Sequence, residues 1–145
     1  MRNTLTSGDR VLVLGSSGFV GSHLAPVFEA LGVELAGFDL HPDPHHGRPT
    51  TIGDVRDVDA LIEAMTGCTA VLNLAAAHHD FGIGTATFES VNVGGARAIC
   101  AAMEHHGITT DTSGIGPPSP GGCPAWRRAA STVPSSRAGY RDHRW

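Results

Sequence analysis

The amino-acid sequence predicts an α/β protein built on a doubly wound, parallel β-sheet. Short apolar runs rich in β-branched residues alternate with longer stretches in which apolar residues recur every three or four positions. These are the patterns of buried strands and of helices that cover a sheet. The first apolar run also leads directly into three regularly spaced glycines, and the second ends at an acidic residue.

The first strand and helix are the clearest elements. Val11–Leu14 is a short β-rich run that ends at glycine, which is typical of a buried parallel strand. A helix is expected to follow and to stop at Gly32, with a kink at Pro26. Its apolar positions recur at helical spacing: Phe19, Val20, Leu24, Val27, Phe28 and Leu31.

The following residues predict two further strands and a short helix. Residues 33–40 read as a second strand ending at Asp39, and residues 41–50, rich in proline and polar residues, as an exposed loop. A brief third strand precedes Asp54, and Asp57 is the expected N-cap of a helix that closes at Gly67. One face of this helix carries Val58, Leu61, Ile62 and Met65.

A fourth strand and a long helix complete the pattern. Residues 69–77 are strongly apolar, and a helix is expected from about Thr87 to His106, ending at Gly107. Its inward positions are predicted to be Phe88, Val91, Ala98, Ile99, Ala102 and Met103. The sheet is therefore expected to be incomplete, with about four strands.

The pattern stops at Ile108. Residues 111–145 contain no Leu, Phe or Met, but hold five of the nine prolines, five of the ten arginines and both tryptophans. Such a composition cannot fill a buried strand or an amphipathic helix. We expect a folded unit over residues 1–108 and a disordered tail over 109–145. A change of reading frame near residue 108 is our hypothesis for the switch in composition.

Composition excludes several classes of function. The formal net charge is −4, and residues 1–110 hold twelve acidic residues against five arginines, so no basic surface for nucleic acid is expected. No apolar run reaches the length of a membrane span, and the first residues lack a secretory signal, so a cytoplasmic protein is expected. The three cysteines and the paired histidines have no metal-binding spacing, although His78 and His79 follow the fourth strand and could contact a substrate.

The three glycines predict a phosphate-binding turn. Gly15, Gly18 and Gly21 lie between a strand and a helix, where glycine allows a tight turn, close approach of a pyrophosphate and close helix packing. A glycine-rich turn alone is common, but here an acid ends the next strand. Asp39 is expected to bind an adenosine ribose and to repel a 2′-phosphate, which favours NAD over NADP. The alternative is that Asp39 is only a solvated residue at a strand end.

Four segments in order resemble the NAD-dependent epimerase/dehydratase group of the extended short-chain dehydrogenases/reductases. They are VLGSSGFVGSHL, GDVRD, VLNLAAAHHD and FESVNVGGARAICAAMEHHGI, within about residues 10–108. The resemblance implies a Rossmann fold with bound NAD, and usually a nucleotide-sugar substrate. It implies a pyrophosphate along the glycine turn and an adenine beside one acidic and one apolar residue. It also implies that the ribose and the nicotinamide linkage lie in front of small residues at the end of the fourth strand. The residues concerned are Gly15, Ser17, Gly18, Phe19, Val20 and Gly21 for the turn, Asp54 and Val55 for the adenine, Leu74, Ala75 and Ala76 for the strand end, and Asn92 for a helix position near the active site.

Each match also has a purely structural interpretation. Asp54 could cap a turn, and the small residues at 74–76 could serve only helix packing. Asn92 could face solvent, or it could bridge two backbone segments.

The sequence departs from the family pattern where catalysis is expected. The family carries a Ser or Thr on a fifth strand, followed by Tyr-x-x-x-Lys, in which the lysine lowers the pKa of the tyrosine. This chain has no lysine, and its only tyrosine, Tyr140, is followed four residues later by Arg144, whose fixed fork does not replace a lysine. Thr112 and Ser113 echo the expected Ser or Thr, but no apolar strand surrounds them. No catalytic residue is therefore assigned.

Three functional hypotheses remain open. The chain could be part of a nucleotide-sugar epimerase or dehydratase without its substrate domain, a dinucleotide-binding module without turnover, or a fragment without function. A homo-oligomer is also possible, because half of a Rossmann sheet leaves an edge strand exposed.

Overall fold

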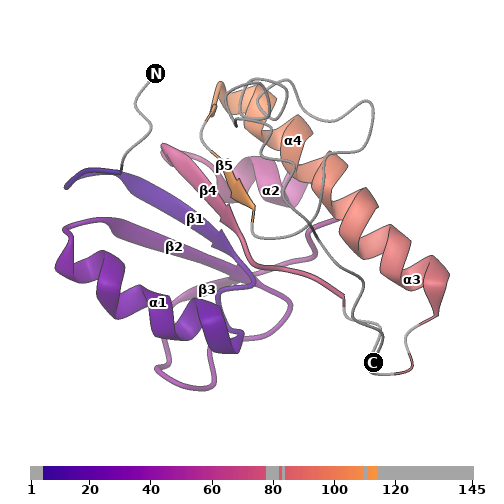
Figure 1. The fold of residues 1–145 in the computed structure, drawn as a ribbon. Coiled ribbons are helices and arrows are strands. Elements are labelled where there is room, and N and C mark those ends of the chain that lie inside the picture. The colour runs from indigo at the N-terminus through magenta and orange to yellow at the C-terminus, as the bar shows by residue number, and fades with distance from the viewer. Residues whose placement is uncertain (1–4, 78–81, 83, 110, 114–145) are drawn as a thin grey trace, which may run out of the picture.

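The computed structural model describes residues 5–77, 82, 84–109 and 111–113. These residues form a parallel five-stranded sheet in the order β3-β2-β1-β4-β5, flanked by helices (Figure 1). The elements, in chain order, are β1 (Arg10–Leu14), α1 (Phe19–Ala30), β2 (Glu34–Asp39), β3 (Thr50–Ile52), α2 (Val58–Ala64), β4 (Ala70–Asn73), α3 (Thr85–Glu89), the π-helical turn η2 (Ser90–Gly94), α4 (Gly95–His106) and β5 (Asp111–Ser113). The predicted doubly wound Rossmann-like sheet is confirmed.

Strand β1 lies at the centre of the sheet and is covered on both faces. Its alternate residues Leu12 and Leu14 pack into the larger core with α2 and α4, whereas Val11 and Val13 pack into a smaller core that includes Phe28 of α1. This alternation follows from the two-residue period of a strand. Figure 1 shows the same arrangement, with α1 on one face and α2 and α4 on the other.

The structure confirms the predicted start of α2 at Asp57 and the predicted end of α4 at Gly107. The Asp57 side chain caps α2 by accepting a hydrogen bond from the Ala60 N–H at 3.1 Å. At the end of α4, Gly107 has a φ of 66°, the left-handed conformation that glycine adopts without strain. The single long helix expected here is the continuous series α3, η2 and α4, in which a π-helical turn interrupts the α-helical pattern.

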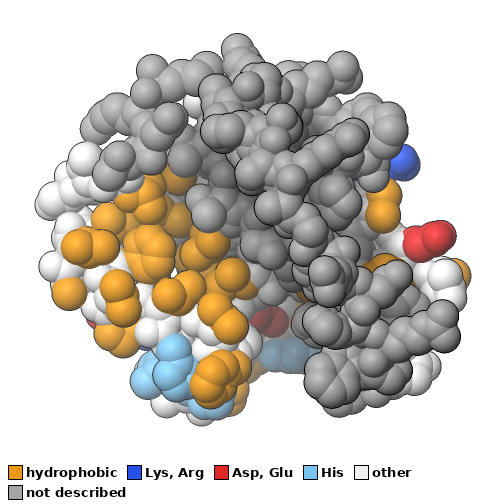
Figure 2. Space-filling model, in the orientation of Figure 1, with side chains coloured by type: hydrophobic (Ala, Val, Ile, Leu, Met, Phe, Trp, Pro, Cys, Tyr) orange, Lys and Arg blue, Asp and Glu red, His pale blue; other side chains and the backbone are white. Residues whose placement is uncertain are grey.

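Helix α1 buries its small residues more completely than its large apolar ones. The buried positions are Gly21, Ser22 and Ala25, and the helix continues through Pro26 to Ala30. Small side chains let the helix approach the glycine turn and the sheet closely. Of the large apolar residues of the helical pattern, Leu24 and Phe28 are half-buried, whereas four others are left outside, with exposed fractions of 73% for Phe19, 54% for Val20, 54% for Val27 and 63% for Leu31. Figure 2 shows apolar side chains gathered on the surface over the region of α1.

Strand β5 corrects the expectation that no strand follows Gly107. Residues Asp111–Ser113 pair in parallel with Val71–Asn73 of β4. A strand at the edge of a sheet needs backbone partners on one side only, so three residues without an apolar pattern can form it. The remaining tail, including Tyr140 and Arg144, lies outside the described residues, as do His78 and His79.

Within the described ranges, no helix combines the length and apolar character required to span a bilayer.

Candidate dinucleotide-binding site

A groove of about 430 Å³ opens at the carboxyl ends of β1, β2 and β4. Its volume falls within the range of small-molecule sites. Eleven of the thirteen predicted site residues line it: Gly15, Gly18, Phe19, Val20, Gly21, Asp39, Asp54, Val55, Leu74, Ala75 and Ala76. It is also lined by Leu40, Gly53, Arg56 and Val91, whereas Ser17 and Asn92 are not among its lining residues. The fold thus brings together residues that are far apart in the sequence.

Glycine is present at each of the three positions of the turn for a different physical reason. Gly15 has a φ of 80°, and a Cβ there would lie 2.8 Å from the Ala75 nitrogen, in the segment that continues β4. A Cβ on Gly21 would lie 2.6 Å from the Gly15 oxygen, so this glycine lets α1 pack onto the turn. Gly18 has an ordinary extended backbone, and its Cβ would approach only the Gly15 oxygen, at 3.3 Å. Gly15 and Gly21 are thus required by the fold, and Gly18 is the least constrained of the three.

The first turn of α1 is suited to an anion. Gly18 is the N-cap of this helix and provides no side-chain cap, and no acidic residue lies in the first turn. The first N–H groups of a helix have no partners within the helix, and the helix dipole places partial positive charge there. The start of α1 therefore offers hydrogen-bond donors for an anion, whereas the N–H groups of residues 15–18 in the turn already donate to acceptors within the protein.

Asp39 joins the end of β2 to the glycine turn. Its Oδ2 accepts a hydrogen bond from the Ser17 N–H at 3.0 Å, and its Oδ1 accepts one from the His41 N–H at 3.2 Å. The Ser17 hydroxyl donates to the His41 carbonyl oxygen at 2.7 Å. A carboxylate has about four acceptor positions, so Asp39 retains capacity for ligand hydroxyls in the groove. Ser17 is buried beneath the turn and supports Asp39, so the structure does not place it at the groove surface.

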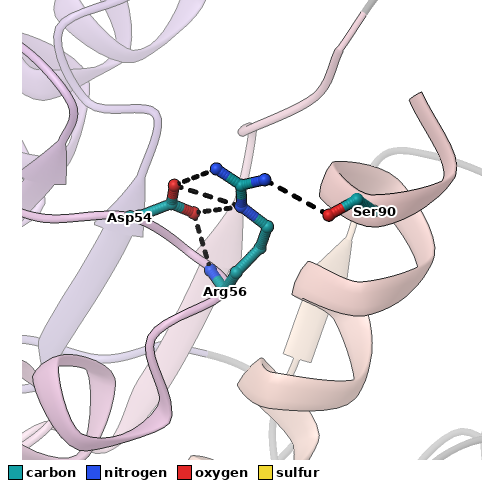
Figure 3. Close-up of polar contacts among 3 residues, drawn as sticks. All are labelled: Asp54, Arg56 and Ser90. Atoms are coloured by element: carbon teal, nitrogen blue, oxygen red, sulfur yellow. Dashed lines mark hydrogen bonds and ion pairs between the residues drawn. The ribbon is translucent and has the colours of Figure 1, made fainter. Parts of the chain in front are cut away.

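Two other lining residues of the groove, Asp54 and Arg56, form an ion pair (Figure 3). The Arg56 Nε donates to both carboxylate oxygens, at 2.9 and 3.1 Å, and its backbone N–H also donates to Oδ1. The guanidinium lowers the pKa of the Asp54 carboxyl from its usual value, an effect that partial burial opposes. Arg56 also donates to the Ser90 hydroxyl of η2 at 3.2 Å. Asp54 is therefore held in its charged form within a local turn.

Asn92 bridges two backbone segments, one of the two alternatives left open by the sequence. Its Oδ1 accepts from the Ala77 N–H at 2.9 Å, and its Nδ2 donates to the Ala77 carbonyl oxygen at 3.0 Å. This pair connects η2 to the chain that leaves β4. Asn92 thereby fixes the segment that follows Leu74, Ala75 and Ala76 rather than lining the groove itself.

Four groove residues were missed in the sequence, namely Leu40, Gly53, Arg56 and Val91. Arg56 lies two positions after Asp54, a spacing that allows an ion pair within a turn, and this was the signal available in the sequence. Val91 was expected to face inward, but only the π-helical turn places it at the groove.

The described part of the chain contains no group of three or more His, Cys, Asp or Glu side chains arranged to hold a metal ion. The paired His45 and His46 are exposed, as expected. In the pair on α4, His105 is exposed, whereas a ring nitrogen of the half-buried His106 lies 2.7 Å from the Ile62 carbonyl oxygen.

Comparisons with known proteins agree with this geometry. The model of the NAD dependent epimerase/dehydratase family matches residues 11–115. The match passes residue 108 and includes β5, so family-type sequence continues beyond the point at which the sequence analysis placed a change of reading frame.

Two curated relatives are similar to the chain. N-acetyl-alpha-D-glucosaminyl-diphospho-ditrans,octacis-undecaprenol 4-epimerase of Escherichia coli O157:H7 is 40% identical over 100 residues, 69% of this chain and 30% of that protein. The 3-beta-hydroxysteroid dehydrogenase of Mycolicibacterium neoaurum is 33% identical over 108 residues, 68% of this chain and 30% of that protein. The chain therefore spans about 30% of the length of these relatives.

A solved structure of an epimerase is also similar to this chain. The UDP-glucose 4-epimerase of Thermus thermophilus, in complex with NAD, matches with a TM-score of 0.58 and 29% sequence identity, over 68% of this chain and 35% of that one. On the strength of the family match, the sheet and the glycine turn, the chain belongs to the NAD-dependent epimerase/dehydratase family.

Proposed function

We propose that the groove binds NAD, and that the protein acts on a nucleotide-sugar substrate as an NAD-dependent epimerase or dehydratase. The observation that carries the proposal is the glycine turn at the start of an uncapped helix, with Asp39 at the neighbouring strand end. The relative from Thermus thermophilus holds NAD in its structure. Two of the three relatives named above are, by name, 4-epimerases of sugars linked to a diphosphate.

Each part of the groove suits one part of the cofactor. The backbone donors at the start of α1 suit the pyrophosphate, and the glycine turn lets it approach them closely. The Asp39 carboxylate suits the ribose hydroxyls and disfavours a 2′-phosphate. Asp54 and Val55 suit the adenine, and the small side chains of Ala75 and Ala76 leave room for the ribose and the nicotinamide linkage. When bound, NAD supplies hydride transfer, and this chain's residues hold and orient it.

A second candidate is a module that binds the dinucleotide without turnover. Among the residues that line the groove, the ionisable side chains are Asp39, Asp54 and Arg56. Two of these three form an ion pair with each other. None of them is a phenol or imidazole of the kind that transfers protons near neutral pH. The described residues thus provide binding chemistry for the cofactor more completely than acid–base chemistry for a substrate.

Calorimetric titration of the full chain with NAD and with NADP tests the binding proposal. We expect NAD to bind more tightly, and the Asp39→Asn variant to lose about tenfold or more in NAD affinity, because a hydrogen bond to a charged group contributes about 1.5–3 kcal/mol. The same variant should narrow the difference between NAD and NADP. NADP binding as tight as NAD binding would refute the assigned role of Asp39, and a chain that binds neither would be a fragment without this function.

Turnover of UDP-glucose, followed by separation of the sugar-nucleotide products, distinguishes the two candidates. Product formation supports the epimerase proposal. Tight NAD binding without any product supports the module that binds without turnover.

A further inference from the structure

Arg56 connects two segments that are distant in the sequence. Its guanidinium is held by Asp54 in the turn after β3 and donates to Ser90, which lies 34 residues further along the chain in η2. Figure 3 shows the guanidinium between the two side chains, with the carboxylate on one side and the hydroxyl on the other. The planar fork of arginine can serve both partners at once, whereas a lysine ammonium has no such fixed geometry.

The segment that Arg56 reaches is itself part of the groove wall. The π-helical turn η2 carries Val91, which lines the groove, and Asn92, which is paired with the backbone of Ala77 after β4. This turn is therefore held at two points, by Arg56 of the loop after β3 and by Ala77 of the segment after β4. Single π-helical turns within α-helices occur frequently at functional sites, because they redirect side chains that a regular helix would place elsewhere.

A third contact shows how closely the helix lies against the Asp54 turn. A Cβ on Gly95, the first residue of α4, would lie only 3.0 Å from Cγ2 of Val55. Val55 lines the groove next to Asp54. The start of α4 and the preceding π-helical turn are therefore seated directly on the loop that carries Asp54, Val55 and Arg56.

We propose that Arg56 is a positioning residue for the dinucleotide, and that its contact with Ser90 holds Val55 and Val91 at the separation that the ligand requires. This inference rests on the proposed binding of NAD by the groove. It assigns no chemical step to Arg56, which acts by holding Asp54 and η2 in place.

The Ser90 hydroxyl provides the cleanest test, because Ser90 is not among the groove-lining residues and its hydroxyl contacts Arg56, which is. We expect Ser90→Ala to weaken NAD binding by about threefold to tenfold, since a hydrogen bond to a charged group is lost at an exposed position. Ser90→Thr, which keeps the hydroxyl, should restore most of the affinity. Thr87→Ala, one turn earlier on the exposed surface of α3, is the matched control and should leave the affinity unchanged.

A double-mutant cycle separates positioning from a general loss of structure. In the Arg56→Met background, in which position 56 has no N–H donor on its side chain, the further change Ser90→Ala should have little effect on NAD affinity, because the contact is already lost. Urea denaturation should give nearly equal unfolding midpoints for Ser90→Ala and Thr87→Ala.

The outcomes distinguish this inference from the proposed function. Binding of NAD by the wild-type chain together with unchanged affinity in Ser90→Ala, or with additive effects of the two changes, refutes the positioning role alone. Failure of the wild-type chain to bind NAD refutes the proposed function and, with it, this role.

Discussion

The Gly18→Val variant tests whether the glycine turn holds a pyrophosphate. Gly18 lines the groove, has an extended backbone that valine adopts readily, and has only the Gly15 oxygen near its Cβ position. The added carbons therefore extend into the groove. An N–H···O hydrogen bond needs about 2.7–3.2 Å between its heavy atoms, whereas nonbonded carbon contacts lie at about 3.5–4.0 Å. A pyrophosphate cannot reach the backbone donors beside a valine without moving outward.

The magnitude follows from the number of hydrogen bonds lost. One hydrogen bond to a charged group contributes about 1.5–3 kcal/mol, and each 1.4 kcal/mol is about tenfold in Kd. We therefore expect NAD to bind about ten- to a hundredfold more weakly to Gly18→Val in calorimetric titrations. AMP, which lacks the pyrophosphate, should lose less affinity than NAD.

Gly84→Val is the matched control. Gly84 is also a helix N-cap with an extended backbone, and it has open space at its Cβ position and does not line the groove. Both variants replace glycine with valine at an N-cap, where valine is less favourable, so both should lose a similar amount of stability. Equal NAD affinity in the wild-type protein and in Gly18→Val would show that the turn does not approach a phosphate and would refute the reasoning.

Three further predictions concern stability and reactivity. Asn92→Ala should lower the free energy of unfolding by about 1–3 kcal/mol, because the half-buried N–H and C=O of Ala77 lose their partner. An unchanged midpoint in urea denaturation would contradict this. Arg56 lowers the pKa of Asp54 in the folded protein below its value in the unfolded chain, so the unfolded chain binds more protons at acidic pH. The stability that this ion pair contributes is therefore present above about pH 4 and is lost as the pH falls further. The deficit of Arg56→Gln relative to the wild type should therefore shrink between pH 6 and pH 3 in urea titrations, whereas a constant deficit would exclude the ion pair as its cause. Burial raises the pKa of the Cys68 thiol, so peptide mass spectrometry should find slow alkylation of Cys68 at neutral pH that accelerates on unfolding.

The fold class and the turn could be predicted from the sequence because both depend on local signals. The Asp57 cap, the Gly107 helix end and the glycine turn each involve residues within a few positions of one another. The cofactor groove could also be anticipated, since parallel strands bring Asp39 and Ala75 to the same edge of the sheet.

Helix α1 shows where the local pattern was insufficient. Helical spacing identifies a row of large apolar residues, but it does not say which face meets the sheet. The close approach of Gly21 to the Gly15 oxygen decides that the small residues face inward. Strand β5 escaped detection for a related reason, because backbone pairing at an edge does not require an apolar sequence.

The sequence by itself determined the order of the first four strands and of the helices that follow them, the glycine turn and the acid at the end of β2. Only the tertiary structure decided that Asn92 bridges to Ala77, and that Arg56 reaches Ser90 across 34 residues. The physical reason is the range of the interactions. Caps and turns are formed between residues close in the chain, whereas the walls of the groove are set by hydrogen bonds that exist only once the sheet has brought distant segments together.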